Sequence, residues 1–152
     1  MKRALLSAAL AVAFGAGLSA QNKPDFTGAW KPDAARSKTI GGLGPAQTIT
    51  VEGSKMTIVR TVAGNSSSVV YILDGTPSKN LVGVPGNQRE ITYTSKWEGN
   101  VLVTTWTPSA AISDVERRSI EADGTMKVEV THNFIKEPGK SETSTRVFNK
   151  IN

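Results

Sequence analysis

Hydrophobic and polar residues alternate along short segments of the chain, and turn residues separate these segments. After Asp123-Gly124, for example, Met126, Val128 and Val130 alternate with polar residues, as in a strand with one buried side. Asp-Gly also tolerates the positive φ angles of a tight hairpin turn. After residue 20, no stretch of ten or more residues shows the helical period of about 3.6 residues. The pattern predicts an all-β protein, with at most one helical turn at residues 32–37.

Nine segments of strand composition lie between the turn signals. They are residues 26–31, 47–52, 55–62, 67–73, 89–97, 101–107, 114–121, 125–133 and 142–149. Short consecutive strands joined by tight turns pair as antiparallel neighbours. A long meander must protect its edge strands, and closure into a barrel removes the edges. We therefore predict an antiparallel up-and-down meander of about 8–10 strands closed into a barrel. A β-sandwich is the alternative.

The composition supports strands and excludes several kinds of site. Residues 21–152 contain 13 Val, 9 Ile and 16 Thr but only 4 Leu, and β-branched side chains favour strands. The chain has no cysteine and one histidine, which excludes disulfides, thiolate metal sites and cysteine nucleophiles. No Asp-rich calcium loop is present either. We expect no metal, no cofactor and no catalytic residue, and we interpret His132 as a strand-end residue.

The first twenty residues have the layout of a secretory signal peptide. Lys2 and Arg3 precede an apolar run from Ala4 to Leu18, and small residues follow. We predict cleavage after Ala20, an exported protein in the periplasm or outside the cell, and one barrel domain over residues 21–152. An uncleaved membrane anchor is the alternative. No second apolar stretch of membrane length follows, so we expect no membrane association after the signal is removed.

The charged residues show no basic face for nucleic acid. Without Lys2 and Arg3, 16 basic residues stand against 13 acidic ones. Their longest basic run is the pair Arg117-Arg118, next to an acidic residue. Nucleic-acid binding usually needs clustered basic side chains. We therefore expect no nucleic-acid partner.

Four short motifs carry a resemblance to a known family. PDFTGAWKPDAARSK, KWEGN, ADGTMKVEVTH and RVFNK stand in this order between about Asp25 and Lys150. Together they resemble the small exported bacterial proteins described as lipocalin-like. The resemblance implies a lipocalin-like β-barrel, and no general activity comes with it.

The same resemblance implies roles for two residues at one barrel end. In lipocalins the tryptophan of the opening Gly-x-Trp motif, here Trp30, closes this end. An arginine from a late strand packs across its ring, and the matching position here is Arg146. An arginine over an indole gains about 0.5–2 kcal/mol. The alternative is that Trp30 is ordinary core and Arg146 is solvated.

At one position the chain departs from the family pattern. Family members often carry Glu-Arg-Trp, whereas this chain has Glu116-Arg117-Arg118. We expect Arg118 to point to solvent. The alternative is a positive charge inside the cavity, which would need a carboxylate or an anionic ligand because an unpaired buried charge is costly. The alternation leaves both orientations open for Arg60 as well.

Three functions are compatible with such a barrel. We predict that it is not an enzyme and that its interior binds a small apolar or amphipathic ligand, because small barrels either hold one ligand or fill with side chains. The alternative is a non-catalytic structural or interaction module of the cell envelope with a filled barrel. A third possibility is a hydrolase or isomerase that uses carboxylates or His132 at the barrel mouth.

Overall fold

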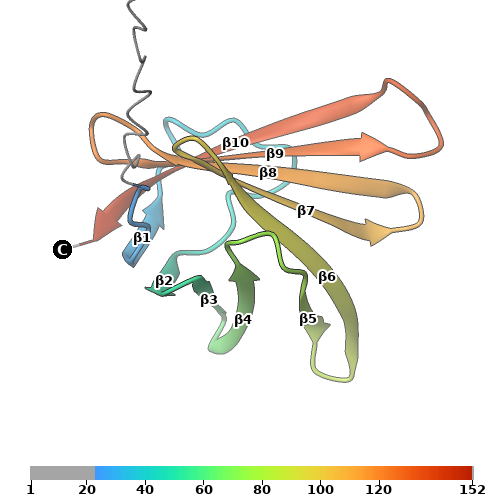
Figure 1. Ribbon diagram of the computed structural model, residues 1–152, viewed down its shortest axis with the longest axis horizontal. Helices are drawn as coiled ribbons and strands as arrows, with labels where there is room; N and C mark the ends of the chain where they lie inside the picture. Colours follow the sequence, from blue (N-terminus) through green and yellow to red (C-terminus); the bar gives the residue numbers. More distant parts are fainter. Residues whose placement is uncertain (1–22, 152) are drawn as a thin grey trace, which may run out of the picture.

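The computed structural model describes residues 23–151, and in this range the protein is all-β (Figure 1). Ten strands follow one another along the chain. They are β1 (Gly28–Pro32), β2 (Gln47–Glu52), β3 (Lys55–Val62), β4 (Asn65–Ile72), β5 (Ser78–Val84), β6 (Asn87–Glu98), β7 (Val101–Ser109), β8 (Ile112–Ile120), β9 (Met126–Phe134) and β10 (Ser141–Ile151). Residues 34–36 form a turn rather than a helix. The predicted signal segment, residues 1–20, lies outside the described residues.

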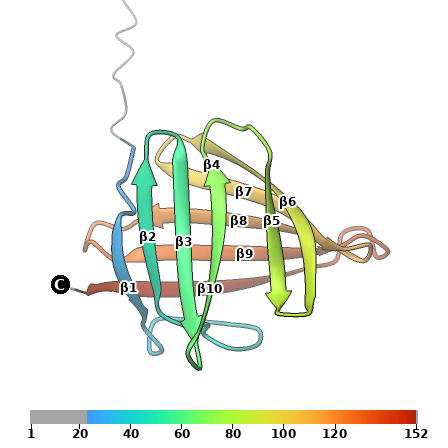
Figure 2. The same cartoon turned by 90° about the horizontal axis from the view of Figure 1, so that it is seen from below.

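The strands form one antiparallel sheet that curls into a nearly closed barrel. Each strand pairs with its neighbours in sequence, except at the seam between β4 and β5, and β1 pairs with both β2 and β10. Figure 2 shows β2 to β5 crossing β7 to β10 steeply, with the interior between these two parts of the sheet. The prediction of an up-and-down barrel is confirmed, and the sandwich alternative is wrong. Within residues 23–151, no helix has the length and apolar character needed to cross a membrane.

All nine predicted strands are present, and two have the predicted bounds, residues 47–52 and 55–62. The strand that the sequence pattern missed is β5, with the sequence SKNLVGV. Its inward positions begin with the polar side chains of Ser78 and Asn80, which are nevertheless buried. A strand with polar residues on its buried face lacks the apolar alternation that sequence reasoning depends on.

Large apolar side chains close one end of the barrel. Phe26, just before β1, is fully buried, and its ring stacks on Trp97 with the centroids 5.8 Å apart. Trp30, Leu102 and Met126 are each at most 1% exposed. These contacts make this end a packed core.

The long connection between β1 and β2 runs beside β10. Asp33 N donates to Val147 O at 2.8 Å, and Lys38 pairs with Thr145 through two backbone hydrogen bonds. Ile40 N then donates to the buried Ser144 Oγ at 2.8 Å. The connection is thereby held against the wall of the barrel, and its glycine-rich part lies close to the inward side chains of β10.

One testable consequence concerns the hairpin between β5 and β6. Gly83 has a φ of +130°, and a Cβ atom there would lie 2.5 Å from the backbone oxygen of Asn87. Gly86 has a φ of +84° but open space around it. We expect Gly83→Ala to lower the free energy of unfolding by about 2–4 kcal/mol. The control Gly86→Ala should lower it by about 1–2 kcal/mol, from the strained φ alone. Equal losses in urea unfolding would contradict the close approach of the Asn87 backbone to Gly83.

Candidate ligand-binding site

The interior of the barrel contains many polar side chains. The buried polar residues on the inward faces include Gln47, Ser95, Thr104, Asp114, Glu116, Arg118 and Ser144. Buried polar groups are destabilising unless they are hydrogen-bonded. Some of these groups are satisfied locally, since Ser95 Oγ and Thr104 Oγ1 bond to each other at 2.8 Å. The partners of the remaining groups therefore show which hydrogen bonds of the interior are satisfied and which are not.

Arg118 and Glu116 point inward from β8 and form a buried ion pair. The Nη2 and Nε atoms of Arg118 donate to Glu116 Oε1 at 2.8 and 3.1 Å, and Nη1 lies 3.2 Å from Met126 Sδ. The side chains are 1% and 7% exposed. The expectation that Arg118 points to solvent is wrong, because its cross-strand partners Leu102 and Val128 both face the core.

The carboxylate that a buried arginine needs is therefore supplied by the same strand. Glu116 and Arg118 stand two residues apart, and residues at this spacing share one face of a strand. Sequence reasoning weighed each charge alone and missed this pair. The spacing within a predicted strand is the signal that identifies it.

Two other interior donors find no acceptor among the described residues. Arg146 faces inward from β10, and its Nη2 donates to Gly42 O in the β1–β2 connection at 3.4 Å. Its Nε is buried and has no partner within residues 23–151. The Nε2 of Gln47, a side chain that is 4% exposed, is in the same situation. An unsatisfied buried donor costs about 1–3 kcal/mol, so both atoms favour the binding of an acceptor.

Arg60 adds a further positive charge to this region. It stands directly opposite Gln47 in the ladder between β2 and β3, on the same inward face. Burial lowers the pKa of the Arg146 guanidinium, the charge of Glu116 opposes this, and the charge of Arg60 lowers the pKa further. We call Gln47, Arg60, Glu116, Arg118 and Arg146 the polar layer. It holds three guanidinium groups and one carboxylate, so it is electrostatically suited to an anion.

Aromatic side chains lie beside the polar layer. The ring centroids of Tyr71 and Tyr93 are 5.3 Å apart, and those of Tyr93 and Trp106 are 5.4 Å apart. Burial raises the pKa of the Tyr71 hydroxyl, and the nearby Glu116 carboxylate raises it further. Burial also raises the pKa of Tyr93. The two phenols therefore stay neutral in the folded protein and provide an apolar surface next to the charges.

Asp114 and His132 form a second polar pair, nearer the ends of β8 and β9. His132 Nδ1 lies 2.7 Å from Asp114 Oδ1, and the side chains are 32% and 5% exposed. They stand directly opposite each other on neighbouring strands, which is why the sequence, where they are 18 residues apart, did not reveal them. His132 lies near the strand end, as predicted, but with a buried carboxylate as its partner. Among residues 23–151, no hydroxyl group hydrogen-bonds to His132.

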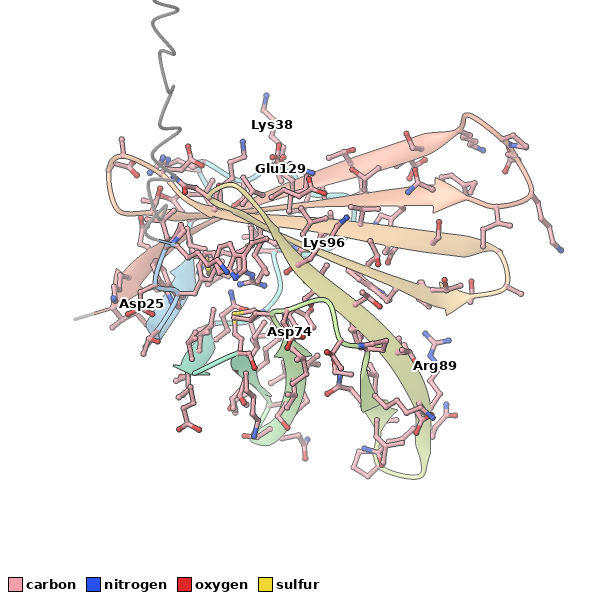
Figure 3. The ribbon with its side chains drawn as sticks, in the orientation of Figure 1. Asp25, Lys38, Asp74, Arg89, Lys96 and Glu129 are labelled. Carbon is pink, nitrogen blue, oxygen red and sulfur yellow. The ribbon has the colours of Figure 1, made fainter. Side chains whose placement is uncertain are left out.

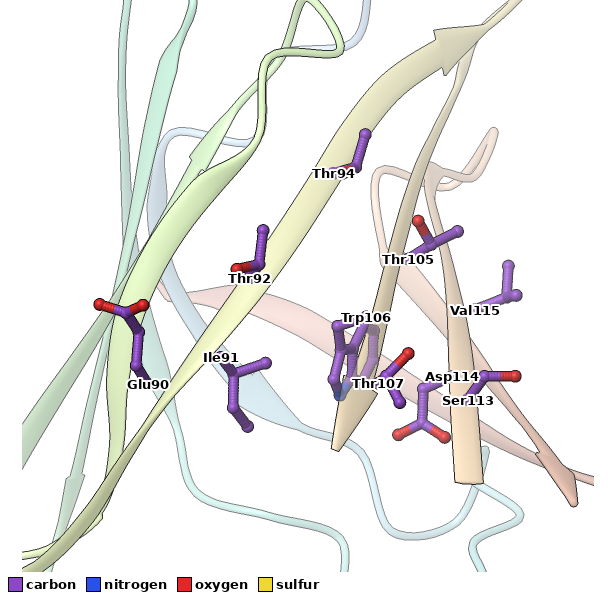
Figure 4. A pocket seen from close by; sticks show the side chains of 10 residues that line it. All are labelled: Glu90, Ile91, Thr92, Thr94, Thr105, Trp106, Thr107, Ser113, Asp114 and Val115. Atoms are coloured by element: carbon purple, nitrogen blue, oxygen red, sulfur yellow. The ribbon is translucent and has the colours of Figure 1, made fainter. Parts of the chain in front are cut away.

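Asp114 borders a groove where β6 leaves β7. The ladder between these strands ends at Tyr93 and Trp106. Beyond this point a groove of about 580 Å³ lies between β6, β7 and β8, and Figure 4 shows the side chains that line it, including Trp106 and Asp114. We call this groove the wedge. Four of the other eight lining residues are threonines, and Glu90 and Ser113 add further polar groups, which makes it a polar opening.

A larger hollow lies at the seam between β4 and β5. We call it the slot; its volume is about 780 Å³. It is lined by Val62, Ala63, Asn65, Ser66, Ser67, Ser68, Lys79, Asn80, Leu81, Gly83, Val84, Pro85 and Gln88. Ser67 stands directly opposite Arg60 in the ladder between β3 and β4. The inner wall of the slot therefore adjoins the polar layer.

Trp30 lies at the packed end, but its partner differs from the expected one. Its Nε1 donates to Phe26 O at 2.8 Å, and the side chain is core, 1% exposed. The cation over its ring is Lys150, whose Nζ lies 5.6 Å from a ring centroid. Lys150 stands directly opposite Trp30 in the ladder between β1 and β10, whereas Arg146 lies further along β10 and reaches Gly42. The expected stacking of Arg146 on Trp30 is therefore wrong, and Lys150 takes that place.

The surface of the described range offers little for metal chemistry. Residues 23–151 contain no group of three or more His, Cys, Asp or Glu side chains that could hold a metal ion. Figure 3 shows charged side chains such as Lys38 and Glu129 pointing away from the barrel wall.

No protein-family model and no curated protein matches the chain. Solved structures do match it. The REP1-NXSQ fatty acid transporter is similar with a TM-score of 0.61 and 17% identity, over 83% of this chain and 96% of that chain. A point mutant of that transporter is similar with a TM-score of 0.60 and 18% identity, over 82% of this chain and 97% of that chain. At these identities the similarity shows a shared fold.

The buried ion pair predicts a large effect of removing one partner. We expect Glu116→Gln to lower the free energy of unfolding by about 3–5 kcal/mol, because it leaves the Arg118 charge buried without a counter-ion. Replacing both residues, as in Glu116→Leu with Arg118→Met, should cost much less. Urea unfolding of the three proteins measures this. A double variant as unstable as the single one would show that the ion pair is not the reason.

The two tyrosines predict a delayed alkaline titration. They are the only tyrosines in the chain, and burial raises the pKa of both above the ordinary value of 10.0. The folded protein therefore keeps its full stability below pH 10.0, the pKa of an exposed tyrosine. Above this pH the unfolded state loses the phenol protons first, and the free energy of unfolding falls. Absorbance at about 295 nm should show little tyrosinate in the folded protein at pH ~10–11. Titration of both phenols before unfolding would contradict their burial.

Proposed function

We propose that the protein is an exported binding protein that carries a small amphipathic molecule with an acidic head group. The observation that carries this proposal is the pair of buried donors without a partner in the described range, Arg146 Nε and Gln47 Nε2, next to Arg60. Donors of this kind are stabilised when a ligand oxygen accepts from them. The surplus of guanidinium groups in the polar layer favours an anionic acceptor over a neutral one.

The apolar part of the ligand would lie along the aromatic side chains and the slot. Tyr71, Tyr93 and Trp106 supply apolar surface beside the polar layer. Val62, Leu81 and Val84 add exposed apolar side chains at the slot. Ligand sites of this kind combine mostly apolar walls with a few polar groups that fix orientation.

The compartment and the first ligand class to test have separate support. The charged, apolar and small-residue layout of residues 1–20 supports export. Two solved structures that share this fold are called fatty acid transporters. Straight-chain carboxylates are therefore the first class of ligand to test. Catalysis has weaker support, because within residues 23–151 no hydroxyl group hydrogen-bonds to His132 of the Asp114–His132 pair.

The test compares carboxylates with alcohols of equal chain length, by calorimetry on protein stripped of ligand by refolding. We expect the carboxylate to bind about 10–100-fold more tightly, as for a charged hydrogen-bonded head group. Arg146→Met should remove most of this preference. The control Arg117→Met should keep it, because Arg117 is exposed and pairs with Glu98 on the outer face.

Two results would contradict the proposal in different ways. Equal binding of alcohol and carboxylate would show that the polar layer does not hold a head group. Saturable binding of neither would favour the alternative function, an interaction module whose barrel is filled by its own side chains. Native mass spectrometry of the exported protein offers an independent check, since a retained ligand adds its mass to that of the chain.

A further inference from the structure

The barrel wall has a seam that side chains hold together in place of a backbone ladder. The strand order runs round the barrel from β4 to β5, and these two end strands are not paired with each other. Asn80 crosses the seam: its Oδ1 accepts from Val70 N at 2.7 Å, and its Nδ2 donates to Val70 O at 2.9 Å. Ser78 Oγ donates to the same oxygen at 2.7 Å. We call these three hydrogen bonds the strap.

The strap holds the seam at one point only. Figure 2 shows β4 and β5 running in opposite directions and diverging toward the hairpin tips. The slot lies on that diverging side and includes Asn80 in its lining. Ser68 on β4 and Leu81 on β5 line the slot from its two sides. The strap therefore forms the closed end of the slot in the barrel wall.

The two sides of the slot differ in character. On its outer rim, Val62, Leu81 and Val84 are 58%, 63% and 66% exposed. Exposed apolar side chains gathered at one opening mark a place where apolar molecules make contact. Its inner wall includes Ser67, opposite Arg60 of the polar layer. The slot thus has an apolar outer rim and an inner wall that adjoins a positive charge.

We propose that the ligand enters and leaves the barrel through this slot, and that the Asn80 strap is the latch that sets the rate of exchange. The inference rests on the proposed function and adds the route and its control. Opening the seam breaks the three hydrogen bonds of the strap. Opening the wall between β8 and β9 would break a ladder of nine residue pairs. Opening the seam therefore breaks far fewer hydrogen bonds than opening the wall between β8 and β9.

The wedge between β6 and β7 is the competing entrance. It is smaller than the slot, its lining includes four threonines and two carboxylates, and the wall beside it is a continuous ladder up to Tyr93 and Trp106. Within the described range it lacks both the exposed apolar rim and a side-chain latch. The experiment therefore has to distinguish these two openings.

The first measurement is stopped-flow binding of 1-anilinonaphthalene-8-sulfonate, an anionic aromatic probe. We expect Asn80→Ala to raise the association and dissociation rates together by about five- to tenfold, with the Kd changed by less than about twofold. A latch changes the free-energy barrier to ligand entry and exit and leaves the stability of the bound state unchanged. Asn80→Asp keeps the acceptor for Val70 N but loses the donor, so its rates should lie between those of wild type and Asn80→Ala.

The matched control removes a side-chain bond elsewhere in the wall. Thr131 Oγ1 and Thr143 Oγ1 lie 2.9 Å apart on the exposed side of β9 and β10, where the backbone ladder remains. Thr131→Ala should leave both rates unchanged. Hydrogen exchange provides a readout without any ligand: Asn80→Ala should accelerate exchange in β4 and β5 and leave β8 and β9 unchanged.

Cross-linking then seals each opening in turn, and the chain's lack of cysteine makes the labelling unambiguous. Ser68→Cys with Leu81→Cys, joined by a reductant-cleavable bis-maleimide, should slow probe exchange by at least about tenfold, as a blocked conformational step does. Cleavage should restore the rates. Thr92→Cys with Thr107→Cys, joined in the same way across the wedge, should have little effect.

Each result has one interpretation. Three results would overturn the slot as the entrance and leave the proposed function intact. They are unchanged binding rates in Asn80→Ala, unchanged hydrogen exchange in β4 and β5 of that variant, and slowing of probe exchange by the wedge cross-link alone. A change in Kd without a change in both rates makes Asn80 a ligand contact and overturns the latch. If neither the probe nor any carboxylate binds the wild-type protein, the proposed function fails, and the entrance fails with it.

Discussion

Pairing of β1 with both β2 and β10 is the constraint on which the rest of the structure depends. This strand has five residues, and it joins the first half of the sheet to the last strand. Gly28 permits the closure, since its φ is +140° and the stem of Lys150 passes where a Cβ atom would stand. Once the two halves are joined, the inward side chains are removed from water. Every polar group among them must then find a partner inside the barrel or from a ligand.

The interior meets this requirement only in part. Arg118 is neutralised by Glu116, and Ser95 bonds to Thr104. Arg146 and Gln47 keep buried donor atoms without acceptors in the described part of the chain. A core that served stability alone would gain by replacing these two side chains with apolar ones. Their presence favours a ligand that completes their hydrogen bonds.

The two openings in the barrel wall lie where the backbone hydrogen bonds between neighbouring strands stop. The slot lies where β4 and β5 fail to pair, and the wedge lies where β6 leaves β7. The strand that the alternation pattern did not predict, β5, forms one side of the slot. Its buried Ser78 and Asn80 use their side chains on Val70 in place of a backbone ladder. The same polar residues that conceal the strand in the sequence hold the seam in the structure.

Local physical chemistry was sufficient to predict the fold class. β-branched residues, period-two alternation and turn residues act within a few positions, so the all-β meander and the bounds of β2 and β3 followed from the sequence. The closure into a barrel followed from the need to protect strand edges. Glu116 and Arg118 were also within reach, because residues two apart on a strand share a face.

Only the tertiary structure decided which side chains meet across strands. Asp114 and His132 are brought together by the register of β8 with β9, and Trp30 receives Lys150 rather than Arg146 through the register of β1 with β10. Shifting a register by one residue exchanges the inward and outward faces of a strand. The sequence of each strand determined that it would pair. The closed barrel determined the register, and with it which charges were buried and which donors were left without an acceptor in the described range.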